Sequence, residues 1–394
     1  MPDNSLMKRV KRHVGSRIHS FFAVTAPGLE TLCYHEISAL PGIVARAEIV
    51  SGGVEFKGRL QDAYAANLDL RTPIRILMRI AGFKASNFRQ LEKQLDRIPW
   101  ELHINPGTLL QVNVKTIHSR LFHSAAISDR FKRDIDATLY NGSAEQIPDT
   151  QGSVVQNLFV RVLDDHFVVS LDSSGDALYK RGIKTDVGKA PLRETLAAAA
   201  LAWAGYSGKE PLIDPMCGSG TFSLEAASIS RRIPPGWYRN FAFMNWPAFK
   251  TRQWQYLKKV RSRQIALPAA HTVFASDIDP KACTSLESVV RKSDMSGTIN
   301  VVEADFFTRL PHKISRQPGV VTLNPPFGIR LGSIRQRHHL YTEIAEKLKK
   351  DYKKWQAAIF LPDRHLADRF PAGLKRRSIP HGGLELTLLT GRID

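Results

Sequence analysis

The spacing of apolar residues changes near residue 179 of the chain. Before that point, segments with alternating apolar and polar residues are mixed with amphipathic helical segments, which is typical of an α+β region. After it, apolar strand segments and helical segments alternate regularly, which predicts a parallel sheet. We therefore predict an α/β protein with a Rossmann-like C-terminal domain behind an α+β N-terminal region.

The N-terminal half is predicted to begin with a loose basic arm at residues 1–20 and to continue as two α+β subdomains, residues 21–84 and 85–175. The predicted strands are residues 21–24, 49–56 (with a kink at two glycines), 74–80, 109–115, 158–163 and 166–172. The predicted helices are residues 28–37, 60–68, 88–95 and 125–140.

Residues 176–394 form the predicted C-terminal domain. Pro191 is expected to begin its first helix, because proline is favourable in a first helical turn. The predicted helices are residues 191–202, 219–230, 280–293 and 339–355, and the predicted strands are residues 211–214, 273–277, 300–305, 319–323, 357–362 and 384–390.

The charge of the chain is unevenly distributed. The 394 residues include 56 Lys and Arg against 37 Asp and Glu, a formal net charge of +19. Residues 1–20 contribute +4, residues 21–175 contribute −1 and residues 176–394 contribute +16. Because neutralised phosphates release counterions, this excess favours a nucleic acid partner over a charge that serves solubility alone.

Composition and cysteine usage exclude several classes of protein. Hydrophobic residues make up 43% and charged residues 24%, as in an ordinary globular protein. The three cysteines, Cys33, Cys217 and Cys283, form no CxxC pair, which indicates neither a disulfide framework nor a cysteine zinc site. We expect a cytoplasmic protein without a metal, a secretory signal or a membrane span, since the longest apolar stretch is about twelve residues.

A glycine loop follows the first strand of the C-terminal domain, at residues 214–221 (DPMCGSGT). Its glycines allow a tight turn and close approach of a ligand to the unpaired N–H groups of the next helix. The loop is neither a dinucleotide GxGxxG, because Ser223 stands at the third glycine position, nor a P-loop. A ligand with an amino acid and a nucleoside therefore fits better than a pyrophosphate, and Asp214 is suited to hold a cationic amine.

Acidic residues also follow the next two predicted strands. Asp277 is placed to accept hydrogen bonds from two ribose hydroxyls, whereas Asp279 before Pro280 is suited to cap a helix. Asp305, after the third strand, is a candidate acceptor for an adenine amino group.

The tetrapeptide Asn324-Pro325-Pro326-Phe327 follows the apolar strand at 319–323. Two prolines remove two N–H donors, so the Asn oxygen and a proline carbonyl remain as acceptors. Phe327 offers a ring on which a flat base can stack. Such a site accepts two N–H bonds from a planar exocyclic amine and leaves its lone pair facing an electrophile. A plain proline-rich turn is the alternative for the tetrapeptide alone.

These motifs resemble the class I S-adenosylmethionine (SAM)-dependent methyltransferases with an Asn-Pro-Pro-aromatic motif. More closely, the chain resembles the THUMP-domain RNA guanine-N2 methyltransferases. The most specific stretches are residues 180–182 (KRG), 190–197 (APLRETLA), 214–221 and 324–332, and residues 235–237, 241–243 and 246–247 further resemble the RlmL-type 23S rRNA enzymes. The resemblance implies a seven-stranded, mostly parallel methyltransferase sheet behind a ferredoxin-like subdomain (21–84) and a THUMP RNA-binding domain (85–175).

The resemblance also implies an activity: direct transfer of a methyl group from SAM to guanine N2 in 23S rRNA. The residues expected to hold the target base are Asn324, Pro325, Pro326 and Phe327. Those expected to bind the cofactor are Asp214, Pro215, Cys217, Gly218, Gly220, Thr221, Asp277, Ile278, Asp305 and Asn324. Those expected to contact RNA are Arg330, Arg335, Arg337, Arg239, Lys132 and Arg133.

Several features leave alternatives open. The chain departs from the family pattern at Ile329, Phe327 and His381, where Glu, Tyr and Asn are usual. The aromatic and basic segment 234–259 is expected to be a folded flap, with RNA stacking as the alternative. The chain ends at Asp394, where some relatives continue into a second methyltransferase, so we expect one activity. Methylation of tRNA guanine N2, of adenine N6 or of a protein amide, and a non-catalytic RNA-binding role with a vestigial cofactor site, remain the competing hypotheses.

Overall fold

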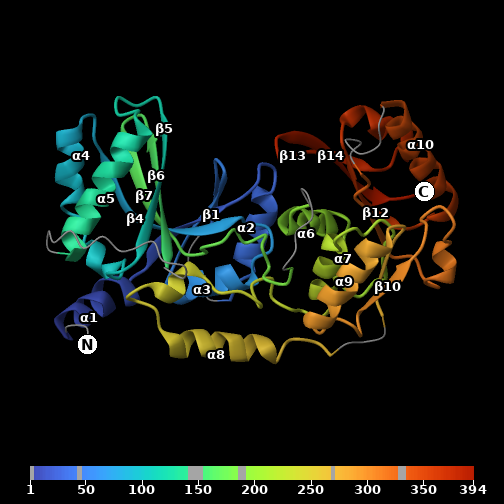
Figure 1. Ribbon diagram of the computed structural model, residues 1–394, viewed down its shortest axis with the longest axis horizontal. Helices are drawn as coiled ribbons and strands as arrows, with labels where there is room; N and C mark the ends of the chain where they lie inside the picture. Colours follow the sequence, from blue (N-terminus) through green and yellow to red (C-terminus); the bar gives the residue numbers. More distant parts are fainter. Residues whose placement is uncertain (1–3, 42–46, 141–153, 185–191, 268–270, 327–333) are drawn as a thin grey trace. The chain divides into compact units, whose positions relative to one another are not determined.

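The computed structural model describes residues 4–41, 47–140, 154–184, 192–267, 271–326 and 334–394 (Figure 1). The chain divides into two compact units. Unit 1 contains Met1–Thr25, Cys33–Leu178 and Asn240–Lys258, and unit 2 contains Ala26–Leu32, Tyr179–Arg239 and Lys259–Asp394. The change in apolar spacing near residue 179 therefore coincides with a boundary between the units, but a later segment returns to unit 1.

Unit 1 is built on one seven-stranded sheet in the order β2-β3-β1-β4-β7-β6-β5. Its strands are β1 (His19–Val24), β2 (Glu48–Val50), β3 (Gly53–Gly58), β4 (Arg75–Lys84), β5 (Leu109–Ile117), β6 (Val155–Leu163) and β7 (His166–Asp172). The long strand β4 pairs with β1 on one side and β7 on the other, both antiparallel. The two predicted N-terminal subdomains therefore share a continuous sheet through β4.

The helices along this part of the chain differ from prediction mainly at the N-terminus. They are α1 (Asn4–Val10), the π-helix η1 (Lys11–Gly15), α2 (Glu30–Ser38), α3 (Leu60–Asp69), α4 (Phe88–Leu95), the 3₁₀-helix η2 (Trp100–Leu102) and α5 (Ser124–Tyr140). Residues 4–15 are helical rather than a loose arm, because Val10 and Val14 lie one turn apart and are both buried. The predicted strand 49–56 is instead the hairpin β2–β3, since Gly52 adopts a positive φ of 86° at its turn.

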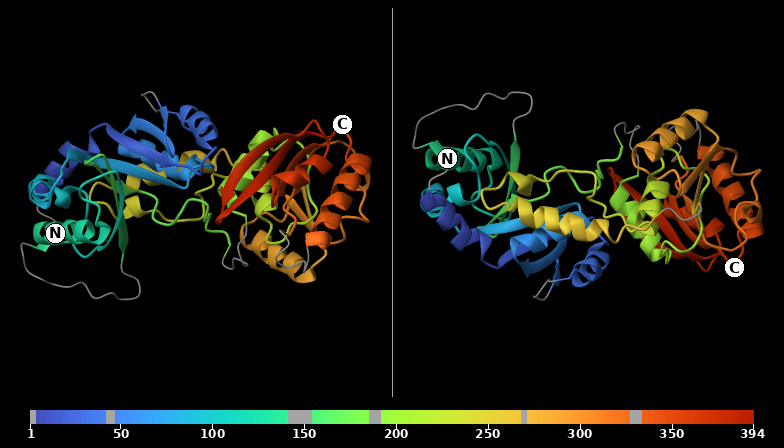
Figure 2. Two further views of the ribbon diagram at one scale, coloured as in Figure 1. Left: turned by 90° about the horizontal axis from the view of Figure 1, so that it is seen from above. Right: turned by 90° about the horizontal axis from the view of Figure 1, so that it is seen from below.

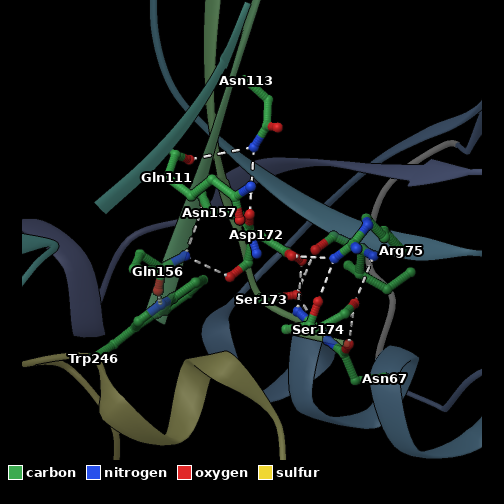
Figure 3. Close-up of polar contacts among 12 residues, drawn as sticks. Asn67, Arg75, Gln111, Asn113, Gln156, Asn157, Asp172, Ser173, Ser174 and Trp246 are labelled. Atoms are coloured by element: carbon green, nitrogen blue, oxygen red, sulfur yellow. Dashed lines mark hydrogen bonds and ion pairs between the residues drawn. The ribbon is translucent and has the colours of Figure 1, made fainter. Parts of the chain in front are cut away.

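The segment Asn240–Lys258 adds a 3₁₀-helix, η3 (Ala242–Asn245), and part of α8 (Thr251–Ser262) to unit 1. The Phe243 ring stacks on Tyr64 of α3 with centroids 4.4 Å apart, and Trp254 meets the same Tyr64 ring edge-on. Trp246 donates from Nε1 to Gln156 Oε1 of β6 at 2.9 Å (Figure 3). The expectation of a packed flap is confirmed for these aromatic side chains, which pack on unit 1.

Unit 2 contains the predicted Rossmann-like sheet, in the order β10-β9-β8-β11-β12-β14-β13. Its strands are β8 (Leu212–Asp214), β9 (Val273–Asp277), β10 (Ile299–Glu303), β11 (Val320–Leu323), β12 (Gln356–Leu361), β13 (Lys375–His381) and β14 (Leu384–Arg392). Strands β10, β9, β8, β11 and β12 are mutually parallel, and β14 runs antiparallel between β12 and β13. The predicted seven-stranded, mostly parallel sheet is confirmed.

Helices cover both faces of this sheet (Figure 2). They are α6 (Glu194–Trp203), α7 (Thr221–Ser230), α9 (Pro280–Lys292) and α10 (Ile334–Asp351), with 3₁₀-helices η4 (Pro311–Lys313) and η5 (Arg364–Arg369). Successive residues of β12 point to opposite faces: Phe360 packs beside Phe222 of α7, while Ile359 joins the core formed with Tyr341 of α10. Helices therefore bury both faces, as the continuous apolar strands require.

Candidate functional site

The sequence-predicted site residues meet at one edge of the unit 2 sheet. Neighbouring strands β10, β9, β8 and β11 are parallel, and Asp305, Asp277, Asp214 and Asn324 lie at or just beyond their carboxyl ends. The strand order reverses between β8, the first strand of this sheet in sequence, and β11. Ligands of open α/β sheets bind outside the carboxyl ends at such a point, so the topology alone selects this edge.

Backbone hydrogen bonds, one of them to strand β9, fix the glycine loop that follows β8. The Cys217 N–H donates to the Ser276 carbonyl of β9 at 2.9 Å, and the Gly220 N–H donates to the Cys217 carbonyl at 2.7 Å. Gly220 has a φ of 72°, and a side chain there would meet Leu286 Cδ1 at 2.2 Å. At Gly218 a Cβ would meet nothing within 4 Å, which leaves space for a ligand beside the backbone.

Asp214 ends β8 and is fully buried. Its Oδ2 accepts from the Ser223 N–H at 3.2 Å and from Ser223 Oγ at 2.7 Å, in the first turn of α7. Burial raises the pKa of this carboxyl to about 7, although its hydrogen bonds with Ser223 and Thr322 oppose the shift. Asp214 therefore fixes the start of α7, and a bound cation would stabilise its ionised form.

Asp277 ends β9 with both carboxylate oxygens already oriented. Oδ2 accepts from the Gly218 N–H at 2.8 Å, and Oδ1 accepts from the Asp279 N–H at 3.0 Å. The next side chain, Ile278, is 70% exposed, so its apolar surface is accessible to a ligand. Asp279 accepts from the Lys281 N–H at 2.9 Å as the N-cap of α9, which confirms its predicted capping role.

Asp305 lies two residues after β10, and its Oδ1 accepts from the Phe307 N–H at 2.9 Å. The following Phe306 is buried in the unit 2 core. This turn fixes the carboxylate near the strand end while Phe306 anchors the backbone behind it.

Asn324 follows β11 directly, with Pro325 buried and Pro326 exposed behind it. Asn324 Oδ1 is buried, and among the described residues it has no hydrogen-bond partner. A buried amide oxygen without a partner is costly, so its retention points to a donor that a ligand supplies. Phe327, Ile329 and Arg330 lie outside the described residues.

Sequence reasoning missed one cation of this site. The Lys184 side chain is 8% exposed, and its Nζ lies 2.7 Å from Thr221 Oγ1, at the start of α7. It also lies 3.3 Å from Glu194 Oε1 at the start of α6. No spacing signal in the sequence points to Lys184, because it belongs to none of the strand-end motifs.

The candidate RNA contacts are scattered. Lys132 and Arg133 are exposed on α5 of unit 1, and Arg335 is exposed on α10 of unit 2. Arg335 and Arg369 line a hollow of about 530 Å³ together with His338 and His339. Arg337 instead faces Asp363, with Nη2 and Oδ2 3.9 Å apart, and Arg239 donates to the Lys180 carbonyl at 2.8 Å.

The described residues give little support for a cysteine nucleophile, a metal site or a membrane span. None of the three cysteines, all of which lie in the described residues, forms a disulfide, and all are buried. Burial raises the pKa of the Cys217 thiol well above its ordinary value, so its thiol is a poor nucleophile. In the described parts of the chain no cluster of three or more His, Cys, Asp or Glu side chains is arranged to hold a metal. Nor does any helix in those parts have the length and apolar character to cross a membrane.

The sheet order, the glycine loop and the strand-end acids define the class: this is the fold and site of a class I SAM-dependent methyltransferase. The space beside Gly218, the fixed carboxylates and the exposed Ile278 fit a ligand with an amino acid, a ribose and a flat base. Residues 181–380 match the RMKL-like methyltransferase domain, and residues 20–77 match the RlmL ferredoxin-like domain. The chain belongs to this family of RMKL-like, SAM-dependent methyltransferases.

Similar proteins cover nearly the whole chain. A Synechocystis protein named "Putative RNA methyltransferase slr0064" is 31% identical over 99% of both chains. The ribosomal RNA large subunit methyltransferase K/L of Methylococcus capsulatus is 32% identical over 93% of this chain, which spans about half (50%) of that relative. The solved structure of "SMU.472, a putative methyltransferase complexed with SAH" has a TM-score of 0.84 at 25% identity, covering 96% of this chain and 99% of its own.

Proposed function

We propose that the protein transfers the methyl group of SAM to the exocyclic N2 amine of a guanine in 23S ribosomal RNA. The observation that carries this proposal is the buried, unpartnered Asn324 Oδ1 at the carboxyl end of β11. The N–H group of an exocyclic amine on a bound base would supply the hydrogen bond that this oxygen lacks. The names of the K/L relatives, which refer to large-subunit ribosomal RNA, support the choice of substrate.

The proposed reaction is a single in-line displacement. The guanine N2 lone pair attacks the methyl carbon, the carbon–sulfur bond breaks with its electron pair on sulfur, and the methylated nitrogen then loses a proton to water. Bound SAM supplies an activated methyl group on a sulfonium. Asn324 Oδ1 and the Pro325 carbonyl accept hydrogen bonds from the two N–H groups of the amine and orient the nitrogen, so positioning is the main contribution of the protein.

The cofactor is held, in this proposal, by the residues at the sheet edge. Asp214 and the loop with Pro215, Cys217, Gly218, Gly220 and Thr221 bind the methionine part. Asp277 accepts from the ribose hydroxyls, Ile278 packs on the adenine and Asp305 accepts from its amino group. Support comes from the preset carboxylate of Asp277 and the exposed Ile278.

The RNA is engaged by both parts of the chain in this proposal. Residues 85–175 act as a THUMP-type RNA-binding domain with Lys132 and Arg133, and Arg335 lies along α10, which follows the Asn-Pro-Pro motif. The target base must leave its helix to reach Asn324, at a cost of a few kcal/mol. The substrate would be met in the cytoplasm.

The test is mass spectrometry of nucleosides from 23S rRNA and tRNA of a strain that lacks the gene. Loss of one N2-methylguanosine from 23S rRNA, restored by the intact gene, is expected. Loss from tRNA would establish the tRNA alternative, and loss of N6-methyladenosine would establish adenine as the target. An unchanged nucleoside pattern, with SAM binding absent by calorimetry, would establish the non-catalytic alternative.

A further inference from the structure

Residues 226–276 form a stretch of 51 residues without a single Asp or Glu but with nine Lys and Arg. Helix α8 (Thr251–Ser262) lies within it (yellow in Figure 1). The sequence of α8 itself contains no Asp or Glu that could pair with its cations at a spacing of three or four residues, and like charges at that spacing repel. Binding of a polyanion would explain why this stretch carries Lys and Arg but no Asp or Glu.

The segment before α8 is firmly built into unit 1. Trp246 donates to Gln156, whose Nε2 in turn donates to the Asp172 carbonyl of β7 at 2.9 Å (Figure 3). Asn105 Nδ2 donates to the Asn245 carbonyl at 2.7 Å. Trp254 is the buried residue of α8 and packs edge-on to Phe243. The start of α8 is therefore held at a fixed place on unit 1.

The side of α8 away from Trp254 carries an aromatic ring between two cations. Arg252, Tyr256 and Lys259 lie at spacings of four and three residues, so they share one face of the helix. All three are exposed, and Tyr256 is 71% exposed. Packing does not explain a tyrosine in this position, whereas alternating cations and rings suit the phosphates and bases of a single strand.

The basic N-terminal helices lie close to the start of α8. A Cβ on Gly15 of η1 would lie 3.6 Å from Lys250 Nζ, immediately before α8. Lys8 of α1 and Lys11 and Arg12 of η1 are exposed. With these segments counted, the residues of unit 1 include 24 Lys and Arg against 18 Asp and Glu, a net charge of +6. The inserted segment and the N-terminal helices thus supply the positive charge that residues 21–175 lack.

We propose that the Arg252–Tyr256–Lys259 face of α8 is an RNA docking surface. Arg252 and Lys259 bind backbone phosphates, and the Tyr256 ring stacks on an unpaired base. The inference rests on the proposed function only for the choice of RNA as the substrate class. It assigns a second RNA-contact region, made of residues outside the Asn-Pro-Pro motif.

Reversing the charge of Arg252 and Lys259 tests whether RNA binds this surface specifically or responds only to the net charge of the protein. Filter binding of an unmodified 23S rRNA transcript is measured from low to moderate salt for the full chain and for R252E/K259E. We expect at least tenfold weaker binding, and a log–log salt slope that is smaller by about 1.5, since each lost phosphate contact removes about 0.7–0.9. The matched control is K349E/K350E, which makes the same charge change on the exposed face of α10 and should weaken binding less than twofold.

The aromatic contribution is tested separately. Tyr256→Ala should weaken binding about 5-fold to 150-fold, the range given by base–aromatic stacking, without changing the salt slope. Tyr256→Phe keeps the ring and should bind as the unaltered protein does. Equal losses for R252E/K259E and K349E/K350E, or unchanged binding in Tyr256→Ala, would overturn the proposal.

Two further measurements keep the outcomes distinct. The affinity for S-adenosylhomocysteine (SAH), measured by calorimetry, should be unchanged in every variant, because none of the substituted residues lies at the sheet edge. A variant that loses SAH affinity is misfolded, and the proposal is then judged on the RNA binding of Tyr256→Ala and Tyr256→Phe. If the unaltered protein forms no N2-methylguanosine but R252E/K259E still loses rRNA binding, the docking surface stands and only the proposed function fails.

Discussion

The backbone N–H of Gly218 donates to Asp277 Oδ2 at 2.8 Å, which joins the glycine loop after β8 to the acid that ends β9. The other oxygen of the same carboxylate accepts from the Asp279 N–H at 3.0 Å. The carboxylate is therefore fixed before a ligand arrives, and its remaining lone pairs are available to two adjacent hydroxyls. Binding need not pay for ordering this side chain.

Replacing Asp277 with Asn should weaken SAH binding at least tenfold. The amide places an N–H against either the Gly218 or the Asp279 N–H, and it removes the charge that strengthens hydrogen bonds to hydroxyls, each of which contributes about 1.5–3 kcal/mol. Calorimetry measures the change. Glu303→Gln is the control, because Glu303 lies opposite Asp277 in the β9–β10 register but is exposed; a comparable loss there would show that net charge alone is responsible.

Asp214 should make SAH binding dependent on pH. Because burial raises its pKa to about 7, the carboxyl is largely protonated at pH 6 in the free protein and must ionise to hold a cationic amine. Affinity should therefore rise as pH increases from 6 to 8, with proton release detectable in buffers of different ionisation enthalpy. Asp214→Asn should bind weakly at every pH, and a pH-independent affinity in the unaltered protein would exclude this role.

The same carboxyl predicts a stability trend. Its pKa is raised in the folded protein above the ordinary 3.8, so the folded state retains a proton that the unfolded state releases. The contribution of Asp214 to stability should fall as pH rises from about 4 to 7 and then level off. Thermal unfolding of the ligand-free protein over this range should be less pH-dependent in Asp214→Asn; an identical slope would contradict the assignment.

Lys184 should act on the carboxylate end of the cofactor. Its Nζ lies 2.7 Å from Thr221 Oγ1, where the N-terminus of α7 also favours an anion. Lys184→Met should weaken binding of SAH but leave binding of 5′-methylthioadenosine, which has no amino acid part, within twofold. Lys209→Met, at an exposed position, is the control. Equal losses for both ligands would mean that Lys184 only supports the loop.

The sequence was informative where local pattern and tertiary context agreed. The strands His166–Asp172 and Val273–Asp277 and the helix Phe88–Leu95 have the bounds predicted for them. Strand β13 (Lys375–His381) was missed because it is basic and contains Pro380, which an edge strand tolerates and a central strand does not. The start of α6 at Glu194 instead of Pro191 reflects Arg193, which remains extended as the N-cap.

The site was predictable to the extent that each residue follows a strand. Parallel strands bring their carboxyl ends together, so Asp214, Asp277, Asp305 and Asn324 could be grouped without coordinates. Lys184 could not, because its role depends on two helix starts that meet in space. Nor could the return of residues 240–258 to unit 1, since apolar aromatics reveal burial but not the surface that buries them.

That return makes Trp246 a stability determinant of unit 1. The side chain is 5% exposed and holds Gln156 Oε1, so Trp246→Ala should lower the free energy of unfolding by about 3–5 kcal/mol. Tyr256→Ala, at an exposed site of the same segment, should change it by less than about 0.5 kcal/mol. Urea unfolding measures both, and a tolerated Trp246→Ala would show that the segment is not an integral part of unit 1.

The most direct test of the account is the pair of measurements on Asn324→Ala. Its Oδ1 has no partner among the described residues, so removing it costs the fold little and leaves the strand-end acids in place. SAH affinity should stay within about twofold of the unaltered protein, while N2-methylguanosine formation on unmodified 23S rRNA falls by at least about 100-fold, in line with a lost positioning contact. Equal loss of cofactor affinity and methylation, or methylation that survives the substitution, would contradict the central claim that Asn324 holds the target amine.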